Sequence, residues 1–263
     1  MAASISVVIP VYDGERFLRE AIESVLAQSL PAAEVVVVDD GSSDRSAAVA
    51  EEFGPPVRVL RKPHRGVSAA RNAGVAESGA ELIAFLDADD RMKPDRLERQ
   101  AAALAEAPAP AIALGREEVL SDPGLEPPPQ LDEGRRYANP YTPMTLLAPR
   151  DAFDQVGPFD ETMRMGQDTD WLLRALEAGF RPVLMEEALI VRRFHGGNLS
   201  YDWEGYRKAM WSILRRRAAR QRAAGRPLAE GIPAGLLLGM PGEGSPLSPS
   251  RESATRRSPW RPP

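Results

Sequence analysis

The sequence predicts an α/β protein whose mostly parallel, Rossmann-type sheet is flanked by helices. Short apolar runs of strand length recur along the first 90 residues, segments with helical hydrophobic spacing alternate with them, and polar clusters follow the runs. Strands that alternate with helices form right-handed crossover units, which pair their strands in parallel. Ligands of such sheets bind beyond the carboxyl ends of the strands, so the same pattern predicts where a site lies.

Two strand and helix units open the chain. Residues 6–9 read as a buried strand and residues 10–14 as a loop, after which apolar side chains recur at helical spacing over residues 17–26, with Asp13 as the candidate N-cap. Four consecutive valines at 35–38 predict a second buried strand. The acidic turn that follows them, DDGSSD, runs into another helix.

A third short strand is predicted at 57–60, followed by a helix that begins at Ser68, its expected N-cap, and carries Arg71 and Asn72. The next strand, residues 83–86, is the last of this parallel series. Its apolar residues predict burial on both faces.

Three carboxylates follow that strand directly, in the stretch IAFLDADD. Side chains alternate along a strand, so Asp87 and Asp89 point the same way where the extended backbone continues. Two hard oxygen ligands on one side suit Mg²⁺ or Mn²⁺, which take the rest of their shell from water and a substrate phosphate. The alternative interpretation is that Asp87, Asp89 and Asp90 only end the strand and cap the next helix. The stretch alone favours neither.

The second half of the chain has weaker periodicity. Residues 94–106 predict a helix, the proline-rich residues 121–134 a loop, residues 144–148 a further strand, and residues 156–160 a turn.

A helix is predicted at 166–179, with Trp171 on its apolar face and Gly179 as the stop. Its acids Asp168 and Asp170 fall in the first turn. The positive end of a helix favours a charged carboxylate, which fits both capping and a general base, and capping is the commoner role.

Composition limits the function classes. The chain has 263 residues, of which 43 % are hydrophobic and 27 % charged, enough for one large domain or two small ones. A net charge of -5 lacks the basic excess that is typical of nucleic-acid-binding proteins. The absence of cysteine excludes disulfides and a thiolate metal site, as suits a cytoplasmic protein. The first residues lack the basic flank of a signal peptide, and no run of 18 apolar residues predicts a membrane span. The glycine motifs of dinucleotide folds and P-loop enzymes are missing.

Seven segments of the chain follow one another in a characteristic order and approximate spacing: VVIPVYDGERFL, VVVVDDGSSD, GVSAARNAG, FLDADD, VGPFDE, GQDTDWLLR and RRFHGGNLS. Together they resemble the family 2 glycosyltransferases, inverting enzymes of the GT-A fold. The resemblance covers roughly residues 4–200, and the joint occurrence of the segments makes it specific. It implies a GT-A-like sheet in a single domain, residues 1–226.

The resemblance implies a nucleotide site and a division of labour along the chain. The nucleotide-binding half is about 1–115, and the acceptor half is about 116–205. In the first half the first loop lies against base and ribose, one acid hydrogen-bonds the base, an arginine lies near the diphosphate, and one acid faces the ribose or sugar. The residues that match these positions are Pro10, Tyr12, Asp13, Asp40, Arg71 and Asp87.

The resemblance also implies a metal and a base. Asp89 matches the metal-binding acid of the DxD motif, and His195 matches a late histidine near the metal and diphosphate, so the expected cofactor is Mn²⁺ or Mg²⁺. Asp168 matches the catalytic base. A cation beside Arg71 neutralises the leaving diphosphate, while a carboxylate on the opposite face of the sugar takes the proton of the acceptor hydroxyl.

Two positions depart from the family pattern. Gln167 stands where the family usually has Glu, which keeps hydrogen bonding and loses a charge. His64 stands where a small polar residue is common, a change interpreted as neutral. Asp170 is a second candidate for the base, although a first-turn helix charge is the favoured interpretation.

The end of the chain is basic and then of low complexity. Eight Lys and Arg residues lie within 207–226, interleaved with apolar ones, which predicts a helix over about 203–226. Such a helix either lies on an anionic membrane surface, where lipid-linked acceptors are found, or packs on the domain with a solvated basic face, and packing is favoured. Residues 227–263 are rich in Pro, Ser, Gly and Arg and predict a disordered tail.

The sequence therefore predicts a metal-dependent inverting glycosyltransferase that moves a sugar from a nucleotide diphosphate donor, a UDP-sugar by preference, to a hydroxyl of a glycan or lipid-linked acceptor. Its expected location is cytoplasmic, with peripheral contact at the inner membrane face through 207–226 as an option. The alternatives are a non-catalytic nucleotide-sugar-binding protein of the same fold, towards which only Gln167 leans, and a nucleotidyltransferase. The latter is expected to carry a glycine-rich loop with arginine after the first strand, where this chain has VYDGERF.

Overall fold

The computed structural model describes residues 3–122, 125, 137–138, 143–196 and 203–225. The tail predicted for 227–263 and most of the loop predicted at 121–134 lie outside these residues. The strands are β1 (Ile5–Val11), β2 (Glu34–Asp39), β3 (Val57–Arg61), β4 (Leu82–Phe85), β5 (Arg91–Met92), β6 (Ala111–Ser121), β7 (Tyr137–Ala138), β8 (Leu147–Pro149) and β9 (Arg181–Phe194).

One sheet joins all of these strands. Its order is β3-β2-β1-β4-β8-β6-β9-β5, with β7 on β6. The four strands of the first half pair in parallel, as predicted, and β6 pairs with β9 in parallel as well. β8 runs antiparallel to both β4 and β6, as do β5 to β9 and β7 to β6, so the sheet as a whole is mixed.

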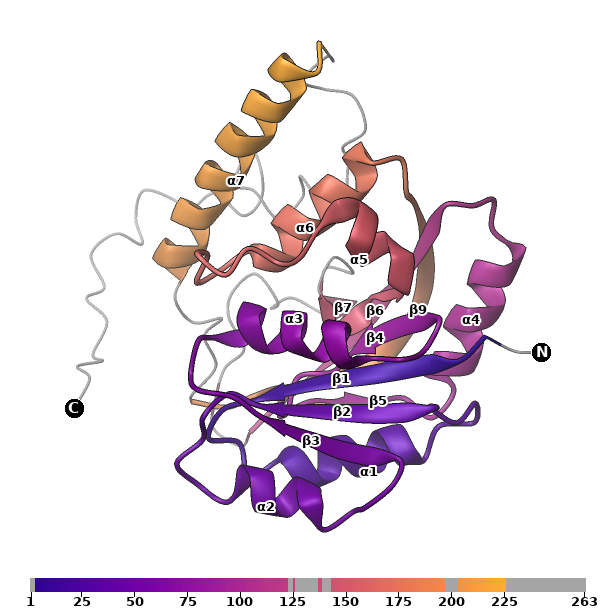
Figure 1. Cartoon of the computed structure of the whole chain (residues 1–263), viewed down its shortest axis with the longest axis vertical. Coiled ribbons are helices and arrows are strands. Elements are labelled where there is room, and N and C mark those ends of the chain that lie inside the picture. Colours follow the sequence, from indigo (N-terminus) through magenta and orange to yellow (C-terminus); the bar gives the residue numbers. More distant parts are fainter. Residues whose placement is uncertain (1–2, 123–124, 126–136, 139–142, 197–202, 226–263) are drawn as a thin grey trace.

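Helices cover both faces of this sheet (Figure 1). They are α1 (Leu18–Leu26), α2 (Ser46–Glu51), α3 (Val67–Glu77), α4 (Arg96–Glu106), α5 (Arg150–Val156), α6 (Gln167–Glu177) and α7 (Trp203–Ala223), with a short 3-10 turn at Pro143–Thr145.

The alternation of side chains along the strands separates two cores. Ile5, Val7 and Ile9 of β1 pack with α1 on one face, whereas Val8 packs on the other face with the aromatic cluster around Trp171. Both cores are almost fully buried. The first half of the sheet is therefore a rigid platform whose strand ends have fixed positions.

Helix α3 lies unusually close to β1. A Cβ atom at Gly74 would fall 2.3 Å from a methyl carbon of Val8, so only glycine permits this approach. The same helix carries Arg71 one turn earlier, and the close packing fixes the position of that arginine over the sheet.

Two predicted helix caps are wrong. Asp13 does not cap α1, which begins at Leu18 with Phe17 at the N-cap position, because the Asp13 carboxylate is bonded to the loop after β2. Ser68 lies inside α3, which begins at Val67 after Gly66. Gly66 has φ +93°, a conformation that suits glycine and turns the chain sharply into the helix.

The elements of the second half were less completely predicted. The pattern missed β6, β9 and α5, and the strand expected at 144–148 begins only at Leu147, after the 3-10 turn. The helix predicted at 166–179 is confirmed as α6, with Asp168 and Asp170 in its first turn. α7 packs on α6 through Met210 and Ile213, as the favoured interpretation of the basic segment expects.

Candidate active site

The ends of β1, β2 and β4 bring the predicted residues to one edge of the sheet. Pro10 is buried within β1, while Tyr12 and Asp13 are exposed beyond it. Asp40 follows β2 directly and is buried. We call the group Arg71, Asp87, Asp89, Asp90 and Asp168 the strand-end site.

Arg71 and Asp87 form the best-defined contact of the strand-end site. Arg71 Nη2 donates a hydrogen bond to Asp87 Oδ1 over 2.7 Å, with 4 % of the arginine side chain exposed against 31 % of the aspartate. The guanidinium is thus held below a carboxylate that remains open to solvent. The resemblance implied Arg71 for the diphosphate and Asp87 for the ribose or sugar, and the structure places the two side chains in contact.

Asp87, Asp89 and Asp90 converge. One carboxylate oxygen of each lies within 4.8 Å of those of the other two. Burial, and then the charge of Asp87, raises the pKa of Asp89 above its ordinary value. Burial and the two neighbouring carboxylates raise the pKa of Asp90 well above its ordinary value.

His195 and Arg193 reach this cluster from the end of β9. His195 Nε2 lies 2.9 Å from Asp89 Oδ2, and the Arg193 backbone N–H donates to Asp90 Oδ1 over 2.7 Å. Asp90 is 2 % exposed, so it anchors β9 to the cluster from beneath. Asp87 and Asp89 are the partly exposed pair.

This cluster fits a divalent cation. Crowded carboxylates with raised pKa values repel one another, and an ion with hard-ligand preference relieves that repulsion. Asp89 offers carboxylate oxygens for it and His195 offers an imidazole nitrogen, which suits Mn²⁺ better than Mg²⁺.

The loops after β1 and β2 are bonded to each other. Asp13, with φ +49°, accepts hydrogen bonds at Oδ1 from the Ser43 backbone N–H over 2.7 Å and from the Asp44 backbone N–H over 3.3 Å. The Asp13 N–H in turn donates to Ser42 Oγ over 3.0 Å. The predicted nucleotide residue Asp13 therefore holds the shape of both loops.

Asp40 does the same for the loop before α3. Its carboxylate accepts from the backbone N–H groups of Arg65 and Gly66 over 2.9 and 2.8 Å. His64 Nδ1 lies 3.0 Å from both the backbone oxygen and Oδ2 of Asp40. The His64 ring lies against Tyr12, with ring centroids 4.1 Å apart and an interplanar angle of 36°.

The Tyr12 and His64 pair is exposed although both rings are aromatic. Tyr12 is 52 % exposed, and the His64 side chain is 55 % exposed. The sequence interpretation treated His64 as neutral, and its place beside Tyr12 and Asp40 was missed because a lone loop histidine carries no pattern. Only the folded structure brings His64 next to the exposed Tyr12 ring.

Asp168 and Asp170 have different surroundings despite their spacing of two residues. Burial raises the pKa of Asp168 above its ordinary value, while the charges of Arg71 and Arg192 act on it in the opposite direction. The Arg71 charge thus acts on Asp168 as well as pairing with Asp87, so we group Asp168 with the strand-end site. Residues two apart on a helix lie about 200° apart around its axis, so Asp170 faces elsewhere.

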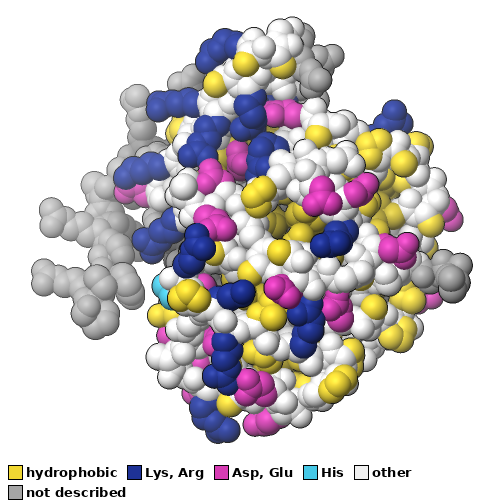
Figure 2. All heavy atoms as spheres, viewed as in Figure 1, with side chains coloured by type: hydrophobic (Ala, Val, Ile, Leu, Met, Phe, Trp, Pro, Cys, Tyr) yellow, Lys and Arg dark blue, Asp and Glu magenta, His cyan; other side chains and the backbone are white. Residues whose placement is uncertain are grey.

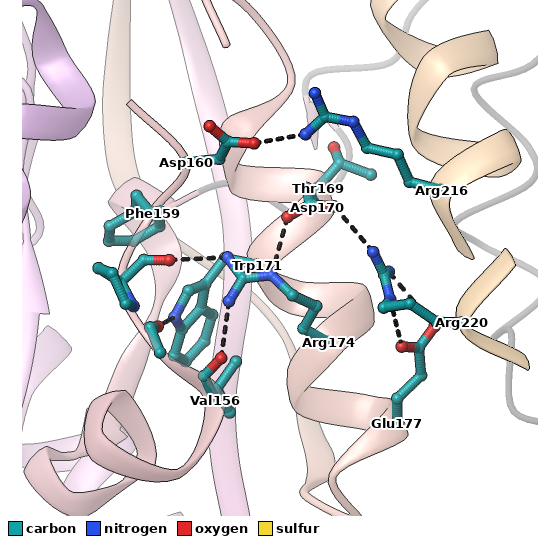
Figure 3. Close-up of polar contacts among 12 residues, drawn as sticks. Val156, Phe159, Asp160, Thr169, Asp170, Trp171, Arg174, Glu177, Arg216 and Arg220 are labelled. Carbon is teal, nitrogen blue, oxygen red and sulfur yellow. Dashed lines mark hydrogen bonds and ion pairs between the residues drawn. The ribbon is translucent and has the colours of Figure 1, made fainter. Parts of the chain in front are cut away.

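Asp170 belongs to a set of ion pairs between α6 and α7 (Figure 3). Its carboxylate accepts from Arg174 Nε over 2.8 Å and lies 3.5 Å from Arg220. Arg220 also pairs with Glu177 over 2.8 Å, and Arg216 pairs with Asp160. We call this group, Asp160, Asp170, Glu177, Arg174, Arg216 and Arg220, the helix junction.

A cavity of about 410 Å³ lies at the helix junction, with Asn72, Pro158, Phe159 and Glu161 in its wall. The acids and arginines of the helix junction are paired with one another, as Figure 3 shows, and Glu161 in the wall pairs with Arg65. The cavity therefore lies within a structural joint between helices. None of the residues predicted to bind the donor lines it.

Three buried polar atoms around the strand-end site have no hydrogen-bond partner within the described residues: Ser68 Oγ, Arg71 Nε and Gln167 Oε1. Ser68 and Arg71 lie at the start of α3, and Gln167 precedes Asp168. Leaving such a group unpaired costs about 1–3 kcal/mol, so these three atoms are candidate contacts for a polar ligand.

An α/β sheet that ends in clustered acids beside a buried arginine is the architecture of the GT-A nucleotide-sugar transferases, and the known proteins agree with that class. The profile of Glycosyl transferase family 2 matches residues 6–164. The chain belongs to this family.

Two relatives carry the same description. "Uncharacterized glycosyltransferase EpsJ" of Bacillus subtilis (strain 168) is 27 % identical over 219 residues, which cover 76 % of this chain and 64 % of EpsJ. An uncharacterized glycosyltransferase of Rickettsia typhi is 28 % identical over 240 residues, covering 82 % of this chain and 73 % of the relative.

Crystal structures of S. aureus TarS 1-349 share the fold. The complex with UDP-GlcNAc matches with a TM-score of 0.65 and 22 % identity over 80 % of this chain and 65 % of that chain. The complex with UDP matches with a TM-score of 0.62 and 21 % identity, again over 80 % of this chain and 64 % of that one. The chain thus spans less than two thirds of EpsJ and of these TarS chains.

Proposed function

We propose that this protein transfers a sugar from a nucleotide diphosphate donor, a UDP-sugar, to a hydroxyl of a glycan or lipid-linked acceptor, with inversion at the anomeric carbon. The observation that carries the proposal is the contact between buried Arg71 and partly exposed Asp87, beside Asp89 and under the same arginine charge as Asp168. The UDP and UDP-GlcNAc complexes of the structurally similar TarS support the choice of donor.

The nucleotide half, about 1–115, holds the donor in this proposal. Tyr12 and His64 offer a ring surface to the base, Pro10 precedes them as a buried residue of β1, and Asp13 and Asp40 hold the loops. Arg71 faces the diphosphate, where its unpaired Nε finds an acceptor. Asp87 binds the ribose or sugar.

Asp89 and His195 would hold Mn²⁺ or Mg²⁺ against the diphosphate. A bound cation stabilises negative charge on the leaving diphosphate, the largest single electrostatic demand of such a transfer. Arg71, which is kept fixed by its burial, would stabilise the same negative charge.

Asp168 acts as the base on the acceptor. Its carboxylate accepts the proton of the acceptor hydroxyl while that oxygen forms a bond to the anomeric carbon. The bond from this carbon to the phosphate oxygen breaks, and its electron pair leaves with the diphosphate. Burial raises the pKa of Asp168, which makes it a stronger base than a solvated carboxylate. The acceptor half is about 116–205.

Titration of the full chain with UDP, in the presence of Mn²⁺ and then of chelator, tests the donor half of the proposal. We expect tight binding only with the metal, lost on Asp89→Ala and kept on Asp95→Ala, an exposed acid on the same stretch of chain. Equal affinity with and without metal would remove the metal role. Metal-dependent binding without sugar transfer to any acceptor would instead identify a non-catalytic binding protein.

Contact with a membrane would serve a lipid-linked acceptor and fits a cytoplasmic enzyme at the inner face. None of the described helices is long and apolar enough to cross a membrane. Any such contact is therefore peripheral in this proposal, and α7 is the segment that the sequence nominated for it.

A further inference from the structure

The two faces of α7 have opposite characters. Met210, Ile213, Arg217 and Gln221 are buried, and they recur at the spacing of one helical stripe. Ile213 and Met210 pack on Leu173 of α6. The buried stripe explains why α7 is folded onto the domain, and it leaves the opposite stripe unexplained.

The opposite stripe is basic and carries an exposed indole. Lys208, Arg215 and Arg222 are exposed and lie seven residues apart, so they form an almost straight line along about 21 Å of the helix. Trp211, 57 % exposed, lies between the first two on the same side. We call these four residues the outer stripe. Figure 2 shows Lys and Arg side chains gathered around α7 at the upper left of the molecule.

The cations of the outer stripe are not needed by the fold. Arg215 and Arg222 form no ion pair among the described residues, and Lys208 pairs only with Glu204, where both side chains are about 70 % exposed and the pair contributes little. By contrast, Arg217 of the buried stripe and Arg216 and Arg220 on the flanks all pair with acids of the domain. Some arginines of α7 thus hold the helix on the domain, whereas Arg215 and Arg222 are available to a binding partner.

We propose that the outer stripe docks the protein on an anionic lipid surface. A straight line of cations on a folded helix presents its charge to a flat surface, and lipid headgroups with phosphate charge complement it. An exposed Trp beside Lys and Arg is the side-chain combination that settles at the headgroup level of a bilayer. The buried stripe keeps α7 on the domain while the outer stripe lies on the lipid.

This orientation places the strand-end site near the membrane plane. The N-terminal end of α7 packs beside Gly166, which directly precedes the first turn of α6 and Asp168; a Cβ at Gly166 would fall 3.6 Å from Ala209 and 2.8 Å from Ile213. A protein lying on α7 therefore holds its candidate base close to the lipid surface.

Sedimentation of the full chain with lipid vesicles tests the docking without any donor or acceptor, so its outcome is independent of transfer activity. We expect binding to vesicles of phosphatidylcholine with phosphatidylglycerol, weakened at high salt, and no binding to phosphatidylcholine alone. Each basic residue contributes roughly fivefold, so Arg215→Ala with Arg222→Ala should weaken binding by roughly 30-fold. Trp211→Ala should weaken it on the order of 10-fold.

The matched control is Arg150→Ala with Arg181→Ala. Both arginines are exposed and lie away from α7, at the start of α5 and of β9, and the double change removes the same charge. This control should bind within about twofold of wild type. The proposal is overturned if the outer-stripe variants bind as wild type does, if the control loses as much, if wild type ignores anionic vesicles, or if short duplex DNA displaces it from them at equal phosphate concentration. Unchanged melting temperatures establish that the outer-stripe variants remain folded.

Discussion

The strand-end site and the helix junction contain the same residue types and treat them in opposite ways. At the helix junction, Asp160, Asp170 and Glu177 each face an arginine. Hydrogen bonding from Thr162 and the Arg216 charge lower the pKa of Asp160. At the strand-end site, carboxylates crowd together, and burial raises the pKa values of Asp89 and Asp168. Acids that each pair with an arginine fit a structural joint, whereas crowded acids with raised pKa values fit a candidate ligand site.

Asp168 and Asp170 bring this contrast onto one helix turn. Asp168→Asn should reduce turnover by roughly 100-fold or more and leave the donor dissociation constant nearly unchanged, because the general base is lost and the nucleotide contacts are not. Asp170→Asn is the matched substitution and should change turnover only a few-fold. Single-turnover rates and UDP titration measure both. If turnover survives at Asp168 and is lost at Asp170, the roles assigned to the two regions are exchanged.

The same pair of substitutions should act oppositely on stability. Asp170→Asn removes the charge between Arg174 and Arg220 and should cost about 2 kcal/mol, somewhat less than deleting one partner of a buried pair. Asp168→Asn should leave the melting temperature unchanged or raise it at neutral pH, because burial disfavours the ionised form that it removes. Thermal melts of the two variants measure the difference.

The pH dependence of that gain has a fixed sign. A carboxyl whose pKa is raised on folding stabilises the fold most when it is protonated, and this contribution is lost as pH rises through the raised pKa. The advantage of Asp168→Asn over wild type should therefore shrink as pH falls from neutrality. The rate of transfer should fall over the same interval, above the ordinary pKa of 3.8. An advantage that grows on acidification would contradict the raised pKa.

Gly166→Ala probes the joint between the two regions. Gly166 has φ +75°, and a Cβ there would fall 2.8 Å from Ile213 Cδ1. Strain in the left-handed region and displacement of Ile213 should together cost about 1–3 kcal/mol. Gly79→Ala is the control, because its Cβ meets only the Glu34 carboxylate at 3.8 Å. Chemical denaturation of both variants gives the comparison, and equal stability would show that α7 adapts to the added methyl group.

The first half of the fold was predictable because its signals are local. The four consecutive valines Val35–Val38 and the apolar run before Asp87 each predict a buried strand. In a parallel sheet, the residues that follow such strands lie along one edge. β9 escaped prediction because its polar residues, Arg192 and Arg193 among them, obey no strand alternation. They are placed by contacts with Glu117 and Asp90, far away in sequence.

The candidate site divides in the same way. Asp87 and Asp89 could be named from their position after a strand, and their proximity is confirmed. The shared arginine of Asp87 and Asp168, and the separation of Asp168 from Asp170, needed the packing of α3 and α6 against the sheet. The predicted helix N-caps were wrong for a related reason. Asp13 found backbone donors in the neighbouring loop, across a sequence separation of 30 residues, that a local pattern does not contain.

His64→Ala has the smallest expected effect. It tests the exposed ring pair of Tyr12 and His64, which is not part of the strand-end site. Removing the ring that lies against Tyr12 should weaken UDP binding roughly fivefold, about 1 kcal/mol, the lower range for stacking of a base on an aromatic ring. Inorganic pyrophosphate should bind the variant as it binds wild type, since Arg71 and Asp89 lie elsewhere in the site. His64→Phe keeps a ring and loses the contact with Asp40, so it separates stacking from the support of the loop. Weakening that is equal for UDP and pyrophosphate would mean that His64, like the residues of the helix junction, only holds the fold.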